Sequence, residues 1–299
     1  MANSITLAKN YVALLDEVYK EAALTSVLDS DPTGMRQGAN AHEILIQKLS
    51  MDGLADYSRN SGYVKGNVKL EWETVQFNYD RGRMFEVDSM DDEETIKTAF
   101  GRLSGEFVRT KVAPEGDAFT FAQLASETGI SKVAEGATLS TGQGVMDAIT
   151  AGAGQMDEDE VPQDQRYLFI TPTLHNLIKQ MDTTKSREML DTFAGVIRVP
   201  QSRFYTAIDL YDGVDHSGTT GQVNESAGYF VKATAGKDIN FMIVHKPAVI
   251  KFNKHTASNI ITPDANQHSD GYIQKYRKYG LVDAYENKRA GIYLHHKAE

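Results

Sequence analysis

The sequence predicts an α+β protein in which helices and strands occupy separate stretches of the chain. Three observations carry this prediction. Apolar and polar residues alternate with a period of two through 68–79, an apolar stripe with a helical period runs through 90–112, and a short apolar strand at 167–170 is followed at once by a helix start. The chain has 299 residues, which is enough for one large domain or two ordinary ones.

The N-terminal stretch 5–28 predicts an amphipathic helix that ends in the turn-forming run 29–34. Apolar side chains, Tyr11 and Leu15 among them, recur there at three- and four-residue steps. Such a stripe must be buried either against the chain's own domain or against a neighbouring subunit, and the pattern leaves both open.

Residues 41–88 predict two long strands joined at a polar, glycine-containing tip at 56–66. The alternation in the second strand changes phase near Thr74, which indicates a bulge or a twist. A long arm this polar cannot build a core of its own, and an isolated hairpin is marginally stable in water. We therefore expect the arm to lie on other surfaces.

The strongest helix prediction covers 90–112, with Ser89 as its cap and acidic residues in its first turn. Pro114 and Gly116 are expected to end this helix, and a second, softer helix is expected at 121–128. At 1.5 Å per residue the first helix is about 30 Å long, which is the width of a small domain.

From residue 137 onward the pattern predicts an α+β domain with a mixed sheet. A helix of small residues is expected at 145–154. Thr171 and Pro172 are predicted to be the cap and the first residue of the next helix. Strands are expected at 167–170, 195–200, 229–231 and 239–244.

The C-terminal stretch carries three further predictions. Residues 281–285 and 290–294 are expected to pair as a hairpin. The adjacent His295 and His296 are interpreted as a solvated pair, because neighbouring residues of a strand face opposite sides and ligate one metal poorly. Three tyrosines separated by basic residues are interpreted as a helical stripe, in preference to a base-stacking surface for nucleic acid: Tyr272, Tyr276 and Tyr279.

The composition and the missing motifs exclude several classes of site. The chain has no cysteine, which excludes disulfides, thiol nucleophiles, zinc–thiolate sites and iron–sulfur clusters. Neither the Gly-x-Ser-x-Gly motif nor a complete phosphate-binding glycine fingerprint is present. The acidic run 157–160 is consecutive, so its carboxylates diverge and we interpret it as solvated. We therefore predict no catalytic residues, no cofactor and no metal site.

The charge and the N-terminus bear on partners and location. Lys plus Arg number 31 against 41 Asp plus Glu, so the formal net charge is −10. This balance disfavours non-specific nucleic-acid binding and provides no polybasic face for a membrane. No signal-peptide pattern is present, and no apolar stretch approaches the roughly 20 residues of a membrane span. We expect a soluble protein made in the cytoplasm.

The order of these parts and several short motifs carry a resemblance to a known family. The motifs are Arg166-Tyr167-Leu168 before Thr171-Pro172, Val199–Arg203, Val244–Val249, Arg277-x-Tyr279, Glu286-Asn287-Lys288 and Gly291-Ile292-Tyr293. In this order, and together with the arms and the long helix, they resemble the major capsid proteins of tailed bacteriophages. The resemblance covers essentially the whole chain.

The resemblance implies the Hong Kong 97 type capsid fold. Its parts map onto this chain as an N-arm at 1–38, an extended E-loop at 39–87, a peripheral domain with a long spine helix at 88–136, an axial domain at 137–247, and a return to the peripheral domain at 248–299. Because the spine helix begins near residue 90, no room is expected before it for a scaffolding segment, which is either a separate protein or has been removed.

The function implied by the resemblance is that of a structural protein and not of an enzyme. Copies are expected to assemble as pentamers and hexamers into an icosahedral virion shell, in the cytoplasm of the host bacterium. The shell encloses double-stranded DNA without binding it specifically. Besides further copies of itself, separate scaffolding, portal and decoration proteins are the partners that the resemblance suggests.

Seven residues are candidates for contacts between subunits. In the N-arm these are Tyr11 and Leu15. In the second arm, Trp72, Phe77 and Tyr79 are candidate apolar anchors, and Arg81 and Arg83 are candidates for bridges to carboxylates of a neighbour. Packing within the chain is the competing interpretation for the five residues of the second arm.

Two other functions remain open from the sequence. A bacterial nanocompartment shell would have the same fold and enclose cargo enzymes, although the N-arm at 1–38 counts against it. An α+β enzyme of an unrecognised kind would need a concave site with converging titratable groups. Particle size in solution separates a shell protein from an enzyme.

Overall fold

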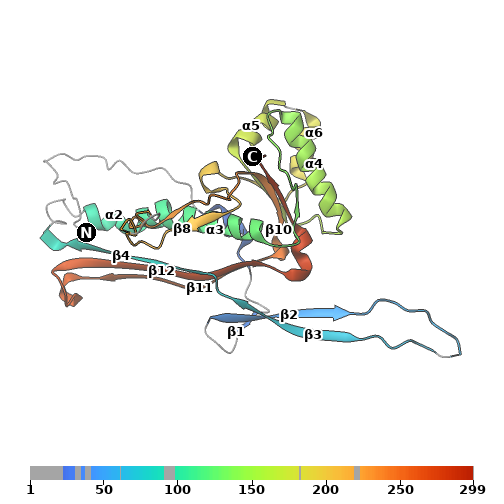
Figure 1. The fold of residues 1–299 in the computed structure, drawn as a ribbon, viewed down its shortest axis with the longest axis horizontal. Coiled ribbons are helices and arrows are strands. Elements are labelled where there is room, and N and C mark those ends of the chain that lie inside the picture. Colours follow the sequence, from blue (N-terminus) through green and yellow to red (C-terminus); the bar gives the residue numbers. More distant parts are fainter. Residues whose placement is uncertain are drawn as a thin grey trace.

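The computed structural model describes residues 23–30, 35–37, 42–60, 62–90, 98–181, 183–218 and 223–298, and it confirms the predicted α+β class (Figure 1). A five-stranded sheet has helices packed against it, and a long three-stranded sheet has a helix lying along it. A hairpin projects away from both. A small two-stranded sheet pairs β8 (Ile208–Leu210) with β9 (Phe230–Lys232).

Only the end of the predicted N-terminal helix falls within the described residues. Leu24–Leu28 form a 3-10 turn, η1, and Leu28 is fully buried. The short strand β1, Met35–Gln37, follows. Residues 5–22, and with them Tyr11 and Leu15, lie outside the described residues, so the rest of that helix stays a prediction.

The predicted hairpin is confirmed. Strands β2 (Glu43–Met51) and β3 (Val68–Gln76) pair antiparallel over their whole length, and β1 pairs with the other edge of β2. Only the base of the hairpin joins a core, through Ile44, Ile46 and Val75.

Soon after the alternation changes phase near Thr74, the chain passes from one sheet to another. The predicted bulge is not found in β3. This strand ends at Gln76, and β4 (Tyr79–Asp88) then pairs with a strand of the long sheet. Asn78 holds the crossing: its Nδ2 donates to the carbonyl oxygen of Val282 at 2.7 Å, and its Oδ1 accepts from the Val282 N–H at 3.1 Å.

The long sheet is antiparallel, in the order β11 (Val249–Ile261), β12 (Gly271–Ala284) and β4. The 3-10 turn η5, Pro263–Ala265, lies between β11 and β12. The helical tyrosine stripe predicted for the tail is therefore wrong. In β12, Lys275 and Arg277 are exposed and alternate with the half-buried Tyr276 and Lys278, which is the period of a strand.

The C-terminal hairpin prediction is also wrong, because its two halves belong to different sheets. Residues 281–284 end β12 in the long sheet. The 3-10 segment η6, Glu286–Gly291, then leads into β13 (Ile292–His296), which pairs with β10 in the five-stranded sheet. A turn of this length looks like a hairpin loop in the sequence, although here it connects two sheets.

The long helix is confirmed from Thr98 onward, but Pro114 and Gly116 do not end it. Helix α2 (Thr98–Phe107) continues through a π-helical turn, η2 (Val108–Val112), into α3 (Ala113–Ser126). Pro114 lies in the first turn after the π-helical segment, where the widened backbone accepts a residue without an N–H. The softer helix predicted at 121–128 is the end of this same helix. Residues 91–97, and with them the predicted acidic first turn, lie outside the described residues. Before them, Asp88 rather than the predicted cap Ser89 accepts a hydrogen bond from the Met90 N–H.

The five-stranded sheet has the order β5-β13-β10-β6-β7 and confirms the predicted mixed sheet, since β5 with β13 and β6 with β7 are parallel pairs. Its other strands are β5 (Ser131–Lys132), β6 (Arg166–Ile170), β7 (Gly195–Arg198) and β10 (Ile239–His245). Helices α4 (Gly142–Glu158), α5 (Pro172–Met181) and α6 (Thr184–Asp191), with the 3-10 turns η3 (Gln201–Arg203) and η4 (Lys246–Ala248), complete this part.

Strand β10 lies at the centre of the core. All its residues are buried, and they alternate between two apolar clusters, with Phe241 and Ile243 in one and Met242 and Val244 in the other. Helix α4 includes the predicted helix 145–154 and begins earlier, at Gly142, with the Thr141 hydroxyl accepting from the Gly144 N–H at 3.2 Å.

The two terminal histidines are buried, which corrects their interpretation as a solvated pair. His295 is 3% exposed and His296 is 5% exposed, because β13 is an inner strand of the sheet. The His295 ring stacks on Phe241 with centroids 4.9 Å apart, and its Nδ1 accepts from the Asn240 amide at 3.0 Å. That hydrogen bond requires an unprotonated Nδ1.

Lowering the pH from 7 to 5 is expected to destabilise the fold by about 2 kcal/mol through His295. Burial, with a smaller contribution from His296, lowers the pKa of His295 to about 4. Its pKa in the unfolded chain is about 6.5, so between these values the unfolded state binds more protons and stability falls with pH. Burial also lowers the pKa of His245, which adds in the same direction.

Urea unfolding at the two pH values measures this effect. The variant His295→Phe keeps the stacked ring and cannot titrate, so its loss of stability should be clearly smaller. The same pH dependence in both proteins would contradict the assignment to His295.

Candidate assembly surfaces

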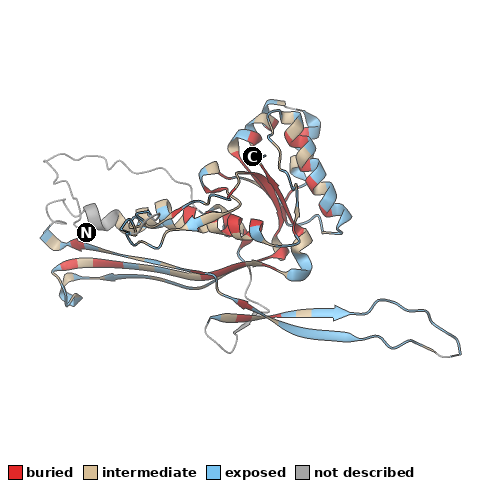
Figure 2. Ribbon diagram, viewed as in Figure 1, coloured by how far each residue is buried: buried red, intermediate tan, exposed pale blue. Residues whose placement is uncertain are grey.

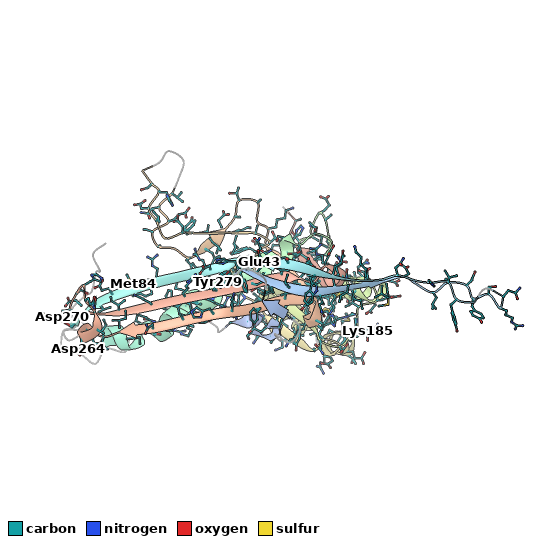
Figure 3. The ribbon with its side chains drawn as sticks, turned by 90° about the horizontal axis from the view of Figure 1, so that it is seen from below. Glu43, Met84, Lys185, Asp264, Asp270 and Tyr279 are labelled. Carbon is teal, nitrogen blue, oxygen red and sulfur yellow. The ribbon has the colours of Figure 1, made fainter. Side chains whose placement is uncertain are left out.

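The outer part of the hairpin exposes apolar side chains that belong to neither of the two large apolar clusters. We call residues 47–72 the arm: the outer halves of β2 and β3 with the loop between them. Figure 2 shows the arm as almost entirely exposed, and in Figure 3 its side chains stand out from the ribbon beyond the body. The exposed apolar residues are Leu49, Met51, Leu54, Tyr57, Tyr63, Val64, Val68, Leu70 and Trp72.

The tip of the arm, which is predicted to be polar, carries exposed aromatic side chains. Tyr57 and Tyr63 are 60% and 87% exposed, and their rings contact one another with centroids 4.8 Å apart. The Ser58–Gly62 bridge brings them together across a tight turn. The sequence predicts a polar stretch here because glycines and charges separate the apolar residues. Two tyrosines on either side of an Arg-Asn-Ser-Gly turn were the available signal.

The candidate anchors Trp72 and Phe77 differ in their surroundings. Trp72 is 39% exposed, within the arm. Phe77 lies at the base of the hairpin, where its ring stacks on Tyr279 with centroids 4.8 Å apart and Lys254 Nζ lies 5.1 Å from its ring centroid. Trp72 thus offers surface to another molecule, whereas much of Phe77 packs within the chain.

Tyr79 and Arg81 converge on one buried carboxylate. The Tyr79 hydroxyl donates to Glu115 Oε1 at 3.1 Å, and Arg81 Nε donates to the same oxygen at 2.8 Å. Burial, helped by Glu115, raises the pKa of Tyr79 and keeps it protonated. Arg81 Nη2 also donates to the carbonyl oxygens of Tyr211 and Tyr229, at 2.8 and 3.4 Å. These contacts join the long sheet, the long helix and the loop between β8 and β9 within one chain.

Arg83 also contacts that loop, since its Nη2 donates to the carbonyl oxygen of Ser226 at 3.0 Å. Of the five candidate residues between 72 and 83, Trp72 is exposed and the other four contact the chain's own body. Their role as contacts between subunits stays a prediction, and Trp72 is the one with the most accessible side chain.

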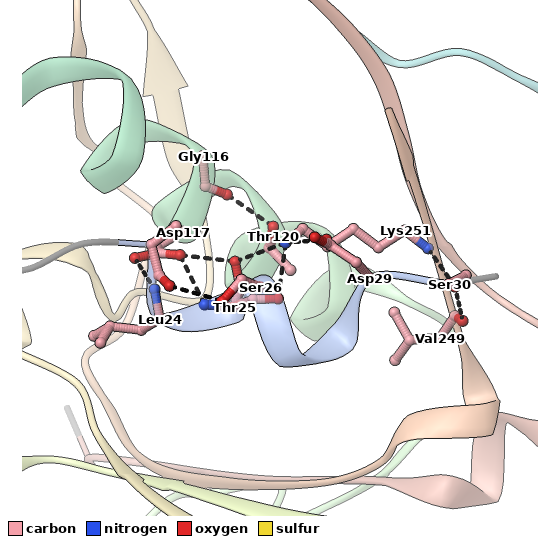
Figure 4. A network of polar contacts seen from close by, with 11 residues as sticks. Leu24, Thr25, Ser26, Asp29, Ser30, Gly116, Asp117, Thr120, Val249 and Lys251 are labelled. Carbon is pink, nitrogen blue, oxygen red and sulfur yellow. Dashed lines mark hydrogen bonds and ion pairs between the residues drawn. The ribbon is translucent and has the colours of Figure 1, made fainter. Parts of the chain in front are cut away.

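A second site, which sequence reasoning missed, holds the chain where the N-terminal residues enter the body (Figure 4). Asp117, on α3 and 1% exposed, accepts from the backbone N–H groups of Leu24 and Thr25, both at 3.0 Å, and from the Thr25 hydroxyl at 2.7 Å. Arg203 Nη1 forms an ion pair with the same carboxylate at 2.8 Å.

Lys251 extends this network from β11. Its Nζ donates to the Thr25 carbonyl oxygen at 2.8 Å and pairs with Asp29 at 2.8 Å. The Ser30 hydroxyl then donates to the carbonyl oxygen of Val249 at 2.9 Å. Residues 24–30 are thus fixed to α3, η3 and β11 at once, and we call this network the Asp117 anchor.

One group in the described chain has the residue types of a metal site. Ligand atoms of Asp212, His216 and Glu225 lie within 4.8 Å of one another on the loop between β8 and β9. They already bind within the loop: His216 Nε2 contacts Asp212 at 2.7 Å, and Glu225 accepts from the Asp212 N–H at 3.2 Å. The hydrogen bond between the side chains raises the pKa of His216 and lowers that of Asp212, which favours an ion pair.

No helix in the described part of the chain is long and apolar enough to cross a membrane. No protein-family model matches the sequence, and neither does any curated protein.

Solved structures match this chain over nearly its whole length. The capsid structure of cyanophage P-SCSP1u matches with a TM-score of 0.63 at 13% identity, over 98% of this chain and 93% of that chain. A structure of Mycobacterium phage Che8 matches with a TM-score of 0.60 at 12% identity, over 99% and 98%. The capsid of Myoviridae phage XM1 matches with a TM-score of 0.57 at 13% identity, over 99% and 100%. The chain has the Hong Kong 97 capsid fold.

The expectation drawn from the resemblance is thus confirmed for the fold. Coverage of 98–99% means that the match to Hong Kong 97 fold structures is not confined to one domain. At 12–13% identity few side chains are shared, which explains why the order of the elements rather than any single motif carried the resemblance.

Proposed function

We propose that this chain is the major capsid protein of a tailed bacteriophage. In this proposal its copies form pentamers and hexamers that close into an icosahedral shell, in the host cytoplasm, around double-stranded DNA. The parts are then an N-arm at 1–38, an E-loop at 39–87, a peripheral domain at 88–136 and 248–299, and an axial domain at 137–247.

The observation that carries the proposal is the exposed apolar surface of the arm. Nine exposed apolar side chains lie on a two-stranded hairpin with no core of its own. Contiguous exposed apolar surface on a soluble chain marks an interaction site. A two-stranded hairpin gains stability only by packing on something else. A second copy of the chain is a partner that is always present. Head-to-tail contacts between copies close into a ring when the rotation from one copy to the next divides a full turn.

The charge supports the proposed content of the shell. With a net charge of −10, a wall of these chains attracts a polyanion only weakly, so DNA is enclosed without specific binding. Separate scaffolding, portal and decoration proteins are further partners in this proposal. No catalytic step is assigned to any residue.

Negative-stain electron microscopy of the purified protein, together with size-exclusion chromatography, tests the proposal. We expect closed shells, capsomers or tubes of megadalton size, and double-stranded DNA inside shells purified from infected cells. Shells that contain a cargo protein instead of DNA would indicate a nanocompartment. A monomer or dimer that persists after co-expression with the products of the neighbouring genes would contradict a shell function altogether.

A further inference from the structure

A cavity of about 350 Å³ lies between the long sheet, the long helix and the loop that joins β8 to β9. Strands β4 and β12 form its floor, and α2 with the π-helical turn η2 forms one wall. The loop closes the other side with residues next to Tyr211 and Tyr229, which Arg81 fixes in place. Figure 1 shows β8 beside the long helix, above the long sheet. A cavity of this volume is within the range of small-molecule sites.

The cavity contains an excess of positive charge. Three cations on its lining form no ion pair with a carboxylate among the residues that the structure describes: Arg83, Lys111 and Lys278. Asp29 and Asp117 attract Lys278 at longer range. Arg83 Nη2 donates to the Ser226 carbonyl oxygen, and Lys111 Nζ lies 4.7 Å from the Tyr229 ring centroid.

The acids of the lining are already neutralised by other groups. Glu115 pairs with Arg81 at 2.8 Å, Glu106 pairs with Arg109 at 2.6 Å, and Asp212 contacts His216 at 2.7 Å. Three unmatched cations in one cavity are notable in a chain whose net charge is −10.

The walls between these cations are aromatic. The Phe107 ring meets Phe85 and Tyr276 edge-on, with centroids 4.8 and 5.8 Å apart, and all three rings line the cavity. Flat apolar walls with a few convergent charged groups are typical of a site for a small ligand that has a ring and a charge of opposite sign. We propose that this cavity binds a small organic anion, a phosphate or carboxylate carried on a ring, independently of shell assembly.

Chemical labelling of Lys278 measures anion binding at a single residue. Lys278 lines the cavity and is half-buried, and burial lowers the pKa of its amine, which increases the fraction of neutral amine. Pyridoxal 5′-phosphate carries a ring, a phosphate and an aldehyde. The Lys278 nitrogen attacks the aldehyde carbon and water leaves, which gives an imine. Borohydride then transfers a hydride to the imine carbon, a solvent proton goes to the nitrogen, and the label becomes permanent.

The experiment treats the full-length, unassembled chain with increasing pyridoxal 5′-phosphate, adds borohydride and locates the label by peptide mass spectrometry. We expect Lys278 to be labelled at about tenfold lower concentration than the exposed lysines Lys132 and Lys185, although it is less accessible. Arg83→Gln should raise the concentration needed at Lys278 about tenfold, because one charge-assisted hydrogen bond to the phosphate is lost. Lys111→Gln, an exposed position on the helix, provides a second variant that does not depend on the packing of Arg83.

Two matched controls decide the outcome. Pyridoxal has the same aldehyde without the phosphate and should show no preference for Lys278. Arg187→Gln removes an exposed arginine on α6 and should leave the labelling unchanged. Equal labelling of all lysines, an equal preference with pyridoxal, or no effect of both Arg83→Gln and Lys111→Gln would overturn the proposed anion site.

Discussion

Replacing Asp117 with Ala is expected to lower the free energy of unfolding by about 3–5 kcal/mol, the cost of leaving a buried ion pair with one partner. The substitution removes the carboxylate that pairs with Arg203, which is 3% exposed. It also removes the acceptor for the N–H groups of Leu24 and Thr25. Urea unfolding of the purified chain, before any assembly, measures this change.

Two smaller substitutions separate the charge from the hydrogen bonds. Asp117→Asn keeps an acceptor oxygen for the backbone of Thr25 and loses the charge that faces Arg203. Thr25→Ala keeps the carboxylate and removes one hydroxyl that both Asp117 and Lys251 contact. We expect the cost to rise from Thr25→Ala through Asp117→Asn to Asp117→Ala. A cost below about 1 kcal/mol for Asp117→Ala would show that the anchor does not hold residues 24–30.

The anchor also shows what the sequence could not provide. Asp117 lies between the two helices that the sequence predicts, and its partners are 86 to 93 positions away along the chain. A buried carboxylate is indistinguishable in the sequence from a solvated one, because burial depends on elements that pack from elsewhere. The same limit explains why His295 and His296 were interpreted as solvated. An inner strand at the very end of the chain has no local signature.

Local patterns predicted an element correctly where the spacing of apolar residues was regular and the partner strand was close along the chain. The hairpin of β2 and β3 and the buried strand β6 agree with the predictions. The predictions failed where two sheets share a short connection, as at η6, and where a π-helical turn accommodates a proline, as at Pro114. In both cases a tertiary arrangement overrides a local signal.

Trp72→Ala is the second substitution with a large expected effect, here on assembly rather than on folding. Trp72 is in the arm, away from both large apolar clusters, and is 39% exposed. Its removal should therefore change the stability of the free chain by less than about 1 kcal/mol. An aromatic anchor at an interface contributes about 2 kcal/mol or more. The concentration at which particles form should then rise about thirtyfold, measured by light scattering and electron microscopy.

Trp72→Phe is the matched control, because it keeps an aromatic ring at the same position and should restore most of the assembly. A general defect in β3 would affect both variants alike. Normal shells formed by Trp72→Ala at the usual concentration would refute the role of this residue as an anchor.

The unmodified chain provides an independent measurement, since Trp72 is its only tryptophan. All tryptophan fluorescence therefore reports on the arm. If the arm is covered by a second copy, emission should shift to shorter wavelength and acrylamide should quench it less as particles form, because the indole leaves water. Phe77 and the rest of the hairpin base already pack on the long sheet, so a change confined to that base would leave Trp72 emission unaltered. Particles that form with unchanged emission would place the contact between copies elsewhere than on this face of the arm.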